Sequence, residues 1–288
     1  MQNYVIYTDS ACEIKPEVLK EWGVLYSCLT FHFNDSEKEY SNDEMDIKTF
    51  YSKMRAGGIA KTSAVNTEVF LREFEKLLSE GKDILYIGFS SGLSPTYNSG
   101  RVAAEQLKEK YPERMIITVD TLAGSAGEGL IVYLTVKKKN EGATIEEAAA
   151  YAESIKLSIC HYVTVDDLVY LKRGGRISPT VAFVGNTLGI KPLIYVDNNG
   201  KLINSGKVRG RKNAIAALLN KYSENAIDPA VGPVVIAHSD CIGEAQELAD
   251  MLKAKHGVSV EFITDIGTVI GAHTGPGTIV IFFVAKER

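Results

Sequence analysis

The first half of the chain alternates short apolar runs with longer segments that carry apolar residues at helical spacing. Four strands are predicted, at residues 4–8, 24–31, 84–87 and 115–119. Helices are expected between them: one has Pro16 in its first turn, one begins near Ser41, and one runs from Thr67 to Gly81. Strands that alternate with helices in this way build a parallel sheet with helices on both faces. The first half is therefore predicted to be an α/β layer structure.

The second half follows a different rhythm. After a long helix expected from Leu122 to Asn140, Thr144 and Glu147 form a T-x-x-E capping box that begins another helix toward Cys160. Two strand-like runs then flank the sequence Asp-Asn-Asn-Gly at residues 197–200, which predicts a β-hairpin. The remaining pattern predicts a helix, a strand, a second helix and two terminal strands, which begin at residues 211, 234, 241, 258 and 278. This order of elements is typical of an α+β unit.

The two halves are not separated by a linker rich in proline, glycine or serine. We place their boundary at residues 158–163, which gives an N-terminal α/β domain at residues 1–160 and a C-terminal α+β domain at residues 161–288. A chain of 288 residues is near the size at which one core stops growing. The expected fold class is thus a two-lobed α/β protein, with closely packed lobes and a ligand cleft between them.

Composition and charge exclude several classes of function. The net charge of −4 provides no basic field for a phosphate backbone, so nucleic acid is not an expected partner. No apolar run approaches the ~18 residues of a membrane span, and no signal peptide is recognisable, so a cytoplasmic protein without membrane insertion is expected. The cysteines lack the spacing of a metal site and read as buried thiols in a reducing compartment; they are Cys12, Cys28, Cys160 and Cys241.

Candidate chemistry is concentrated in segments rich in glycine, serine, threonine and basic residues. Four such segments lie where strands lead into other elements, at residues 61–63, 90–96, 172–176 and 271–277. Ligands often bind at strand ends of α/β sheets, because the unpaired N–H groups of the following helix point outward. An anionic head group would be bound favourably at such a site.

The segment at residues 88–92, Gly-Phe-Ser-Ser-Gly, matches the G-x-S-x-G motif of a nucleophile elbow. With His273 later in the chain, this match raises the alternative of a serine hydrolase of acyl esters that uses Ser90. The competing interpretation is an ordinary strand-to-helix turn, in which Ser94 and Thr96 are equally placed as helix caps. No acidic partner for His273 stands out, so the turn is favoured.

The sequence Lys-Thr-Ser at residues 61–63 has the ending of a phosphate-binding P-loop. Ala60 stands where such a loop requires glycine, and the segment follows a predicted helix end instead of a strand, so nucleotide binding is not expected. The hydroxyls of Thr62 and Ser63 are candidates to donate to a carboxylate, and a solvated loop is the alternative.

Two further segments carry candidate ligand-binding residues. His273 and Thr274 lie in a predicted Gly-Pro loop, a setting that favours contact with a ligand. Arg173 and Arg176 flank a Gly pair, where a guanidinium either pairs with a carboxylate or stays solvated. The glycines at the start of the helix from Leu122 cost up to ~1 kcal/mol each. Either close packing or a ligand on the helix would offset this cost, and the sequence leaves the choice open.

Six motifs together resemble the DegV family of bacterial fatty-acid-binding proteins, and the match spans essentially the whole chain. They are T-D-S-A-C at 8–12, K-T-S at 61–63, S-S-G-L-S-x-T at 90–96, V-D-D-L-x-Y-L-K-R-G-G-R-I at 165–177, I-K-P at 190–192 and G-A-H-T-G-P-G at 271–277. Pro95 is a departure, since the family usually has glycine there. It should stiffen the turn without removing a ligand group.

The resemblance implies a two-domain fold that buries one long-chain fatty acid, such as palmitate, between its lobes. Chains of about 14 to 18 carbons are expected, with no cofactor and no metal. The direct carboxylate donors implied are Thr62 and Ser94, and the rest of the polar site consists of Ser63, Arg173, His273 and Thr274.

The resemblance also implies a partner. Family members of the FakB type present the acid to an ATP-dependent fatty-acid kinase, which forms an acyl phosphate for phospholipid synthesis. The carrier itself is not an enzyme. Arg209 corresponds to the position implicated in docking the kinase, although a solvated basic turn is the alternative. A monomer is expected.

Overall fold

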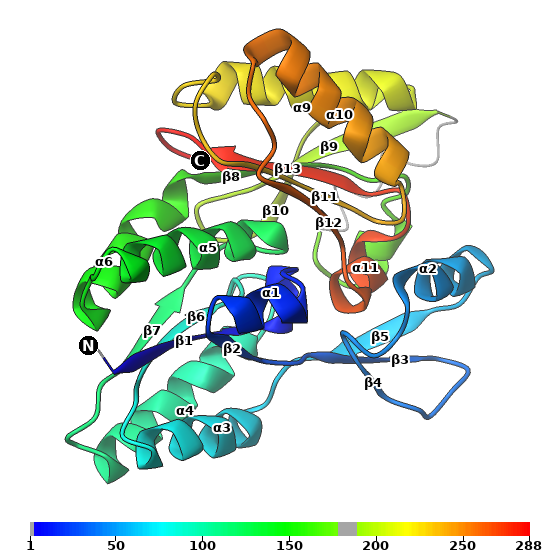
Figure 1. Ribbon diagram of the computed structural model, residues 1–288. Coiled ribbons are helices and arrows are strands. Elements are labelled where there is room, and N and C mark those ends of the chain that lie inside the picture. Colours follow the sequence, from blue (N-terminus) through cyan, green and yellow to red (C-terminus); the bar gives the residue numbers. More distant parts are fainter. Residues whose placement is uncertain (1–2, 178–188) are drawn as a thin grey trace.

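Residues 3–177 and 189–288 are described in the computed structural model of the chain (Figure 1). They form a four-stranded sheet, a six-stranded sheet and a small three-stranded sheet. The first sheet is entirely parallel and the second is mixed. The predicted two-lobed α/β fold class is therefore confirmed.

The parallel sheet of the first lobe is covered by helices on both faces. Its spatial order is β2 (Val24–Ser27), β1 (Tyr4–Asp9), β6 (Asp83–Gly88) and β7 (Ile116–Asp120). One face packs against α3 (Thr67–Ser79) and α4 (Thr96–Lys110). The other face packs against α1 (Pro16–Glu21), α5 (Ala126–Asn140) and α6 (Ile145–Ile155). Burial on both faces explains why neighbouring residues such as Tyr86 and Ile87 are both fully inaccessible.

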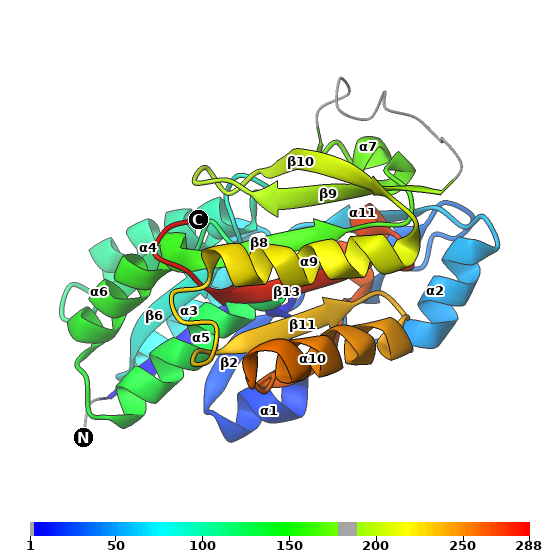
Figure 2. The same ribbon diagram turned by 90° about the horizontal axis from the view of Figure 1, so that it is seen from above.

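The mixed sheet of the second lobe has two long helices on its outer face (Figure 2). Its spatial order is β10 (Leu202–Arg209), β9 (Ile190–Val196), β8 (Ile159–Thr164), β13 (Ile279–Val284), β11 (Val234–His238) and β12 (Phe262–Asp265). The outer helices are α9 (Arg211–Asn225) and α10 (Ile242–His256). The inner face packs on α5, so this one helix lies between the two large sheets (Figure 1).

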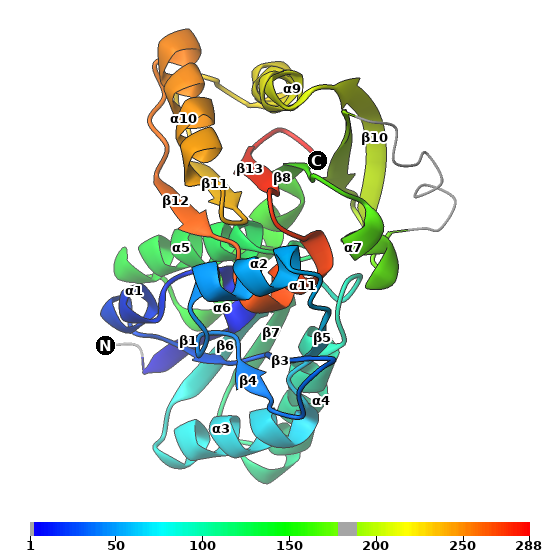
Figure 3. The ribbon, with the colours of Figure 1, turned by 90° about the vertical axis from the view of Figure 1, so that its right-hand side faces the viewer.

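The small sheet packs against a helix from the far end of the chain. Its spatial order is β4 (Tyr40–Ser41), β3 (Thr30–Phe33) and β5 (Ala60–Ser63). The short helix α11 (Thr268–Thr274) packs against β5 and lies beside α2 (Ile47–Arg55) and α7 (Val169–Arg173) (Figure 3). Two single-turn 3₁₀ helices, at Ser10–Cys12 and Lys156–Ser158, complete the described elements.

Several predicted boundaries are wrong. The strand expected at residues 24–31 is two strands in different sheets, because the chain leaves the parallel sheet after Ser27 and joins the small sheet at Thr30. The helix expected from Ser41 begins at Ile47, where the carboxylate of Asp46 accepts the Thr49 N–H at 2.9 Å. The helix expected from Leu122 begins at Ala126.

Two segments differ in type from the prediction, and one strand begins later than expected. The loop expected at residues 61–63 belongs to strand β5, which pairs with β3. His273 lies in the last turn of helix α11 instead of in a loop, and α11 is held at its start by side chains from the first lobe. The Gly267 N–H donates to Glu13 at 2.8 Å, and the Val269 N–H donates to Asn42 at 2.9 Å. The terminal strand expected from residue 258 begins only at Phe262.

Other local predictions are confirmed. Thr144 and Glu147 form the capping box with both hydrogen bonds present, at 3.1 and 2.8 Å. Strands β9 and β10 form the expected hairpin around residues 197–200. The six-stranded sheet begins with β8 at Ile159, and the domain boundary at residue 160 stays a prediction.

Tyr51 of α2 joins the first lobe to the segment that leads into α11. Its buried hydroxyl lies 2.7 Å from the Ile266 carbonyl oxygen and 3.0 Å from the Ser239 hydroxyl. We expect Tyr51→Phe to lower the free energy of unfolding by about 1–3 kcal/mol, because buried polar groups lose their partner. Tyr195→Phe is the control, since the Tyr195 hydroxyl makes no hydrogen bond to the described residues. Urea denaturation measures both, and equal losses would contradict this role of Tyr51.

Candidate functional site

A cavity between the lobes consists of two adjoining chambers. The polar chamber measures about 750 Å³ when the space open to solvent is included, and Thr62, Ser94 and His273 are in its wall. The apolar chamber measures about 510 Å³ on the same basis. The two chambers adjoin, because six residues line both of them: Phe89, Leu93, Leu171, Leu202, Ile270 and Thr274.

The polar chamber brings together residues from three of the segments that the sequence analysis singled out, at 61–63, 90–96 and 271–277. Thr62 comes from β5, Ser94 from the turn before α4, and His273 from α11. The Thr62 hydroxyl lies 2.8 Å from Nε2 of His273. Because α11 packs against β5, residues 211 positions apart meet at hydrogen-bond distance.

His273 is a neutral imidazole in this setting. Burial, together with the positive charge of Arg176, lowers the pKa of His273 to about 4. Its Nδ1 atom is buried and has no hydrogen-bond partner among the described residues. The ring packs closely on the backbone, because a Cβ added at Gly174 would lie only 2.2 Å from Nδ1. Gly174, at the end of α7, therefore makes room for the histidine.

Ser94 presents a hydroxyl group from the turn before α4, and Thr274 presents one from α11. Oγ of Ser94 lies 2.9 Å from the Thr96 hydroxyl and accepts the Thr96 N–H at 3.2 Å, so Ser94 caps the start of α4 from outside the helix. The Thr274 hydroxyl donates to the Ile270 carbonyl at 3.2 Å within α11. Ser94 thus keeps a hydrogen-bonding site close to the chamber, while the hydroxyl of Thr274 is committed to its own helix.

The cationic residue of the polar chamber is Arg176. Its Nε donates to the Leu93 carbonyl at 3.1 Å and its Nη1 donates to the Gly174 carbonyl at 2.5 Å. Its charge has no carboxylate partner within the part of the chain that the structure describes. Burial lowers the pKa of Arg176, and the guanidinium remains protonated at neutral pH. An anionic group in the chamber would complement this charge.

Three of the predicted residues do not lie in the chamber wall. Ser63 is exposed on the opposite side of β5, beside His32 and Lys61, because successive strand residues face opposite ways. Arg173 is exposed on α7, with its guanidinium 5.8 Å from the Tyr170 ring centroid. Arg209 is exposed at the end of β10, away from the cavity. Their predicted roles stay predictions.

The apolar chamber is lined by aliphatic and aromatic side chains from both lobes, among them Val163, Ile194, Val196, Val280 and Phe282. Among the described residues, His161 is the one titratable residue of its wall; it is buried, and burial lowers its pKa well below 6.5. Nδ1 of His161 donates to the Ile159 carbonyl at 2.9 Å, and Nε2 accepts the Gly124 N–H at 3.3 Å. Both ring nitrogens are therefore satisfied by backbone groups, and the chamber offers no free polar partner there.

The glycines at the start of α5 serve packing and the chamber together. A Cβ at Gly127 would lie 2.1 Å from Nε2 of His161, and a Cβ at Gly129 would lie 2.3 Å from the Cys12 carbonyl oxygen. Gly124 and Ser125 line the apolar chamber. The sequence left two explanations open for these glycines. Close packing explains Gly127 and Gly129, whereas Gly124 borders the cavity.

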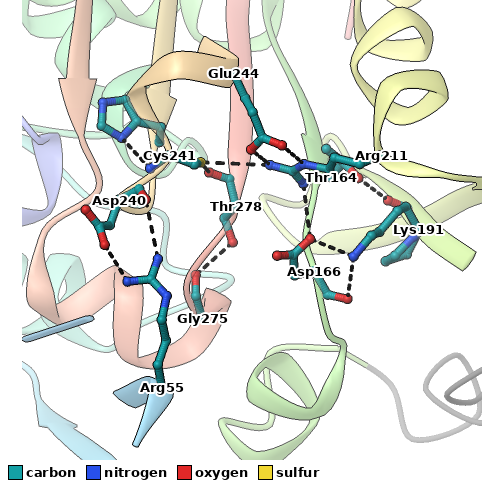
Figure 4. A network of polar contacts seen from close by, with 12 residues as sticks. Arg55, Thr164, Asp166, Lys191, Arg211, Asp240, Cys241, Glu244, Gly275 and Thr278 are labelled. Carbon is teal, nitrogen blue, oxygen red and sulfur yellow. Dashed lines mark hydrogen bonds and ion pairs between the residues drawn. The ribbon is translucent and has the colours of Figure 1, made fainter. Parts of the chain in front are cut away.

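A network of ion pairs anchors the segment that carries α7 and Arg176 (Figure 4). Asp166 pairs with Lys191 at 2.6 Å and with Arg211 at 3.5 Å, and Arg211 also pairs with Glu244 at 2.7 Å. Gly277 lies so close to Asp166 that a Cβ would be 2.2 Å from its carboxylate. The network thus fixes the start of residues 165–177 against three elements of the second lobe.

Ser90 is not arranged as a nucleophile. Its side chain is fully buried, its Oγ donates to the Gly200 carbonyl at 2.9 Å, and it accepts the Gly92 N–H at 3.1 Å. An activated serine needs a general base at hydrogen-bond distance, and no histidine among the described residues lies there. His273 is instead paired with Thr62. The turn interpretation of G-x-S-x-G accounts for this geometry.

Other kinds of site receive no support within residues 3–177 and 189–288. No group of three or more His, Cys, Asp or Glu side chains there is arranged to hold a metal ion. None of the described helices combines the length and the hydropathy that a membrane span requires. Cys12 and Cys160 are buried, whereas Cys28 and Cys241 are half-buried, and all four are free thiols.

Sequence reasoning missed residues on the walls of both chambers. Arg176 was not missed, because the sequence offers it as a candidate together with Arg173, and the structure places only Arg176 at the cavity. His161 gave no signal, because a single histidine in an apolar strand looks like an ordinary core residue. Phe89 and Leu171 were likewise indistinguishable from other buried apolar residues.

Comparisons with known proteins agree on one family. A family model described as "Uncharacterised protein, DegV family" matches residues 3–286. A DegV domain-containing protein of Clostridium perfringens is 42% identical over 289 residues, which cover 100% of this chain and 99% of that protein. A crystal structure of a DegV lipid-binding protein from Thermotoga maritima has 30% identity and a TM-score of 0.86, and covers 99% of each chain.

A second Thermotoga maritima structure, described as revealing a fatty acid binding function, is also similar. It has 28% sequence identity to this chain and a TM-score of 0.84, and the match covers 99% of this chain and 100% of that one.

The low pKa of His273 makes a prediction about stability. In the unfolded chain the imidazole takes up a proton near pH 6.5, whereas in the folded chain it does so only near pH 4. Stability contributed by the neutral ring is therefore lost as the pH falls from about 6.5 to about 4. We expect wild type to lose about 2–3 kcal/mol more than His273→Gln over this range. Urea denaturation at several pH values measures this difference, and parallel curves would contradict it.

Proposed function

We propose, because this chain belongs to the DegV family, that it binds one long-chain fatty acid in the cavity between its lobes. The observation that supports this most strongly is that a polar chamber and an apolar chamber adjoin and share six wall residues. A single-chain amphiphile matches such a space, with a charged head at one end and an apolar tail at the other. The related lipid-binding and fatty-acid-binding structures support the same assignment.

The carboxylate is proposed to lie in the polar chamber. Thr62 and Ser94 donate hydrogen bonds to it, with the neutral His273 positioning the Thr62 hydroxyl. Arg176 supplies the compensating charge, in the place that the family resemblance suggested for Arg173. Hydrogen bonds and a nearby cation both favour the ionised form of a carboxyl group. The acid would therefore be bound as a carboxylate.

The acyl chain is proposed to fill the apolar chamber. Each buried CH₂ group contributes roughly 0.8 kcal/mol, so a tail of about 14 to 18 carbons supplies most of the affinity. Palmitate is within this range. Because the ring nitrogens of His161 are paired with backbone groups, the tail meets no unsatisfied polar atom of that ring.

The chain is proposed to act as a carrier and not as an enzyme. A separate ATP-dependent kinase would phosphorylate the bound acid: a carboxylate oxygen attacks the γ-phosphorus, the bond to ADP breaks, and an acyl phosphate for phospholipid synthesis results. This chain contributes position, because it fixes the carboxylate where a docked partner can reach it. A monomer in the bacterial cytoplasm is proposed, and the four free thiols fit a reducing compartment.

Removal of the two hydroxyls tests the proposed ligand. We expect wild type to release about one fatty acid per chain on extraction, and the Thr62→Val, Ser94→Ala double variant to release several-fold less, because the carboxylate loses two donors. Mass spectrometry of organic extracts measures this. Ser63→Ala is the matched control, since Ser63 lies next to Thr62 but faces away from the chamber. No lipid in wild type, before or after incubation with palmitate, would contradict the proposal.

Charge reversal at Arg209 tests the proposed partner. We expect Arg209→Glu to leave palmitate binding unchanged and to lower formation of acyl phosphate by a fatty-acid kinase about tenfold or more, because rim charges steer docking. Arg72→Glu is the control, since Arg72 is an exposed residue on α3 of the other lobe. Phosphorylation of radiolabelled palmitate measures the effect. Equal rates for the two variants would remove Arg209 from the docking surface.

A further inference from the structure

The hairpin β9–β10 forms one wall of the apolar chamber. Ile194, Val196 and Leu202 of this hairpin line the cavity. The hairpin is joined to the rest of its sheet through β8, and that ladder ends at the pair Tyr162–Tyr195. From Val196 through the turn to Leu202 the hairpin pairs only with itself, and β10 is the edge strand. The turn end is therefore held by contacts other than the sheet.

Ser90 holds the turn on one side. Its Oγ donates to the Gly200 carbonyl at 2.9 Å, and all of Ser90 is buried. The fit is close, because a Cβ at Gly200 would lie 2.1 Å from Oγ of Ser90, and a Cβ at Gly92 would lie 2.4 Å from the Asn199 carbonyl oxygen. Gly200 also has a φ of +70°, which a residue with a side chain rarely adopts. The backbone of the turn thus packs directly against the first lobe.

Arg288 holds the turn on the other side, and the turn lies near this end of the chain in Figure 2. Its Nη1 donates to the Asp197 carbonyl at 3.1 Å and to the Leu122 carbonyl of the first lobe at 2.5 Å. Its Nε and Nη2 donate to the carbonyls of Ile159 and Lys156, at 2.9 and 2.5 Å. One guanidinium therefore joins the hairpin turn to both lobes.

In the described part of the chain, these two side chains make the hydrogen bonds that connect residues 197–201 to other segments. The turn itself is stable, since Asp197 accepts the N–H groups of Asn199 and Lys201 at 3.0 and 2.9 Å. Undocking it would break two hydrogen bonds, expose the freed groups to water and leave the ladder with β8 intact. Val196 and Leu202 would move with it, and the apolar chamber would open.

We propose that Ser90 and Arg288 are positioning residues that hold the hairpin turn closed over the apolar chamber, and that undocking of this turn limits the exchange of a bound acyl chain. This rests on the proposed function. It assigns the conspicuous serine of G-x-S-x-G a role at the cavity, as a latch and not as a nucleophile.

The test is the rate at which preloaded radiolabelled palmitate leaves the protein for phosphatidylcholine vesicles. We expect Ser90→Ala to release palmitate about five- to thirty-fold faster than wild type, since one buried hydrogen bond of the closed state is lost. Arg288→Gln should act in the same direction. Thr135→Val is the matched control, because it removes a buried hydroxyl that donates to the Ile131 carbonyl at 2.7 Å inside α5, away from the hairpin.

An unchanged rate in Ser90→Ala, or an equal acceleration in Thr135→Val, would overturn the latch. Hydrogen exchange on the ligand-free protein tests the docking of the hairpin turn independently of the proposed function. The buried Gly200 amide should exchange faster in Ser90→Ala than in Thr135→Val whether or not the protein binds palmitate. If wild type holds no palmitate, the proposed function fails, and equal Gly200 exchange in the two variants would then overturn the latch as well.

Discussion

The burial of helix α5 between the two large sheets is the packing interaction on which the rest of the molecule depends. The residues of its first two turns are inaccessible, and Leu130 and Ile131 pack with apolar residues of both sheets. Glycines at 127 and 129 permit this approach, because side chains there would collide with His161 and with the Cys12 backbone. Even Glu128 is buried: its pKa is raised well above 4.5 by burial and by the nearby Asp9, and Thr8 donates to it at 2.9 Å. The helix thus holds the lobes at a fixed separation, with the cavity beside its start.

The polar side chains of the site come from segments that are far apart in the chain. Helix α11 belongs to the last part of the chain, yet it lies against the small sheet of the first lobe, where it places His273 beside Thr62. Tyr51, Asn42 and Glu13 each hold the segment that begins this helix. The polar chamber is therefore as rigid as the contact between the lobes, while the hairpin wall of the apolar chamber rests on two hydrogen bonds at its turn.

Local sequence signals identified the elements whose stability is local. The capping box at Thr144 and the hairpin turn at residues 197–200 need no distant partner, and both were predicted correctly. The period of apolar residues was sufficient for the parallel sheet and its covering helices. Predictions failed where a distant partner decides the structure. Residues 61–63 form a strand because β3 pairs with them. Residues 268–274 form a helix, where a loop was expected around His273, because first-lobe side chains accept the N–H groups at its start.

The sequence by itself determined the fold class, the family and the loops from which the candidate site is built, because these follow from short-range patterns and from motifs in a characteristic order. Only the tertiary structure decided which member of each motif reaches the cavity. Thr62 faces the chamber and Ser63 faces solvent, since alternate strand residues point in opposite directions. Arg176 enters the chamber while Arg173 remains outside, and Ser90 contacts a hairpin turn 110 residues away. Which residue reaches the cavity depends on the surfaces that come into contact when the lobes pack, and no local sequence pattern encodes that contact.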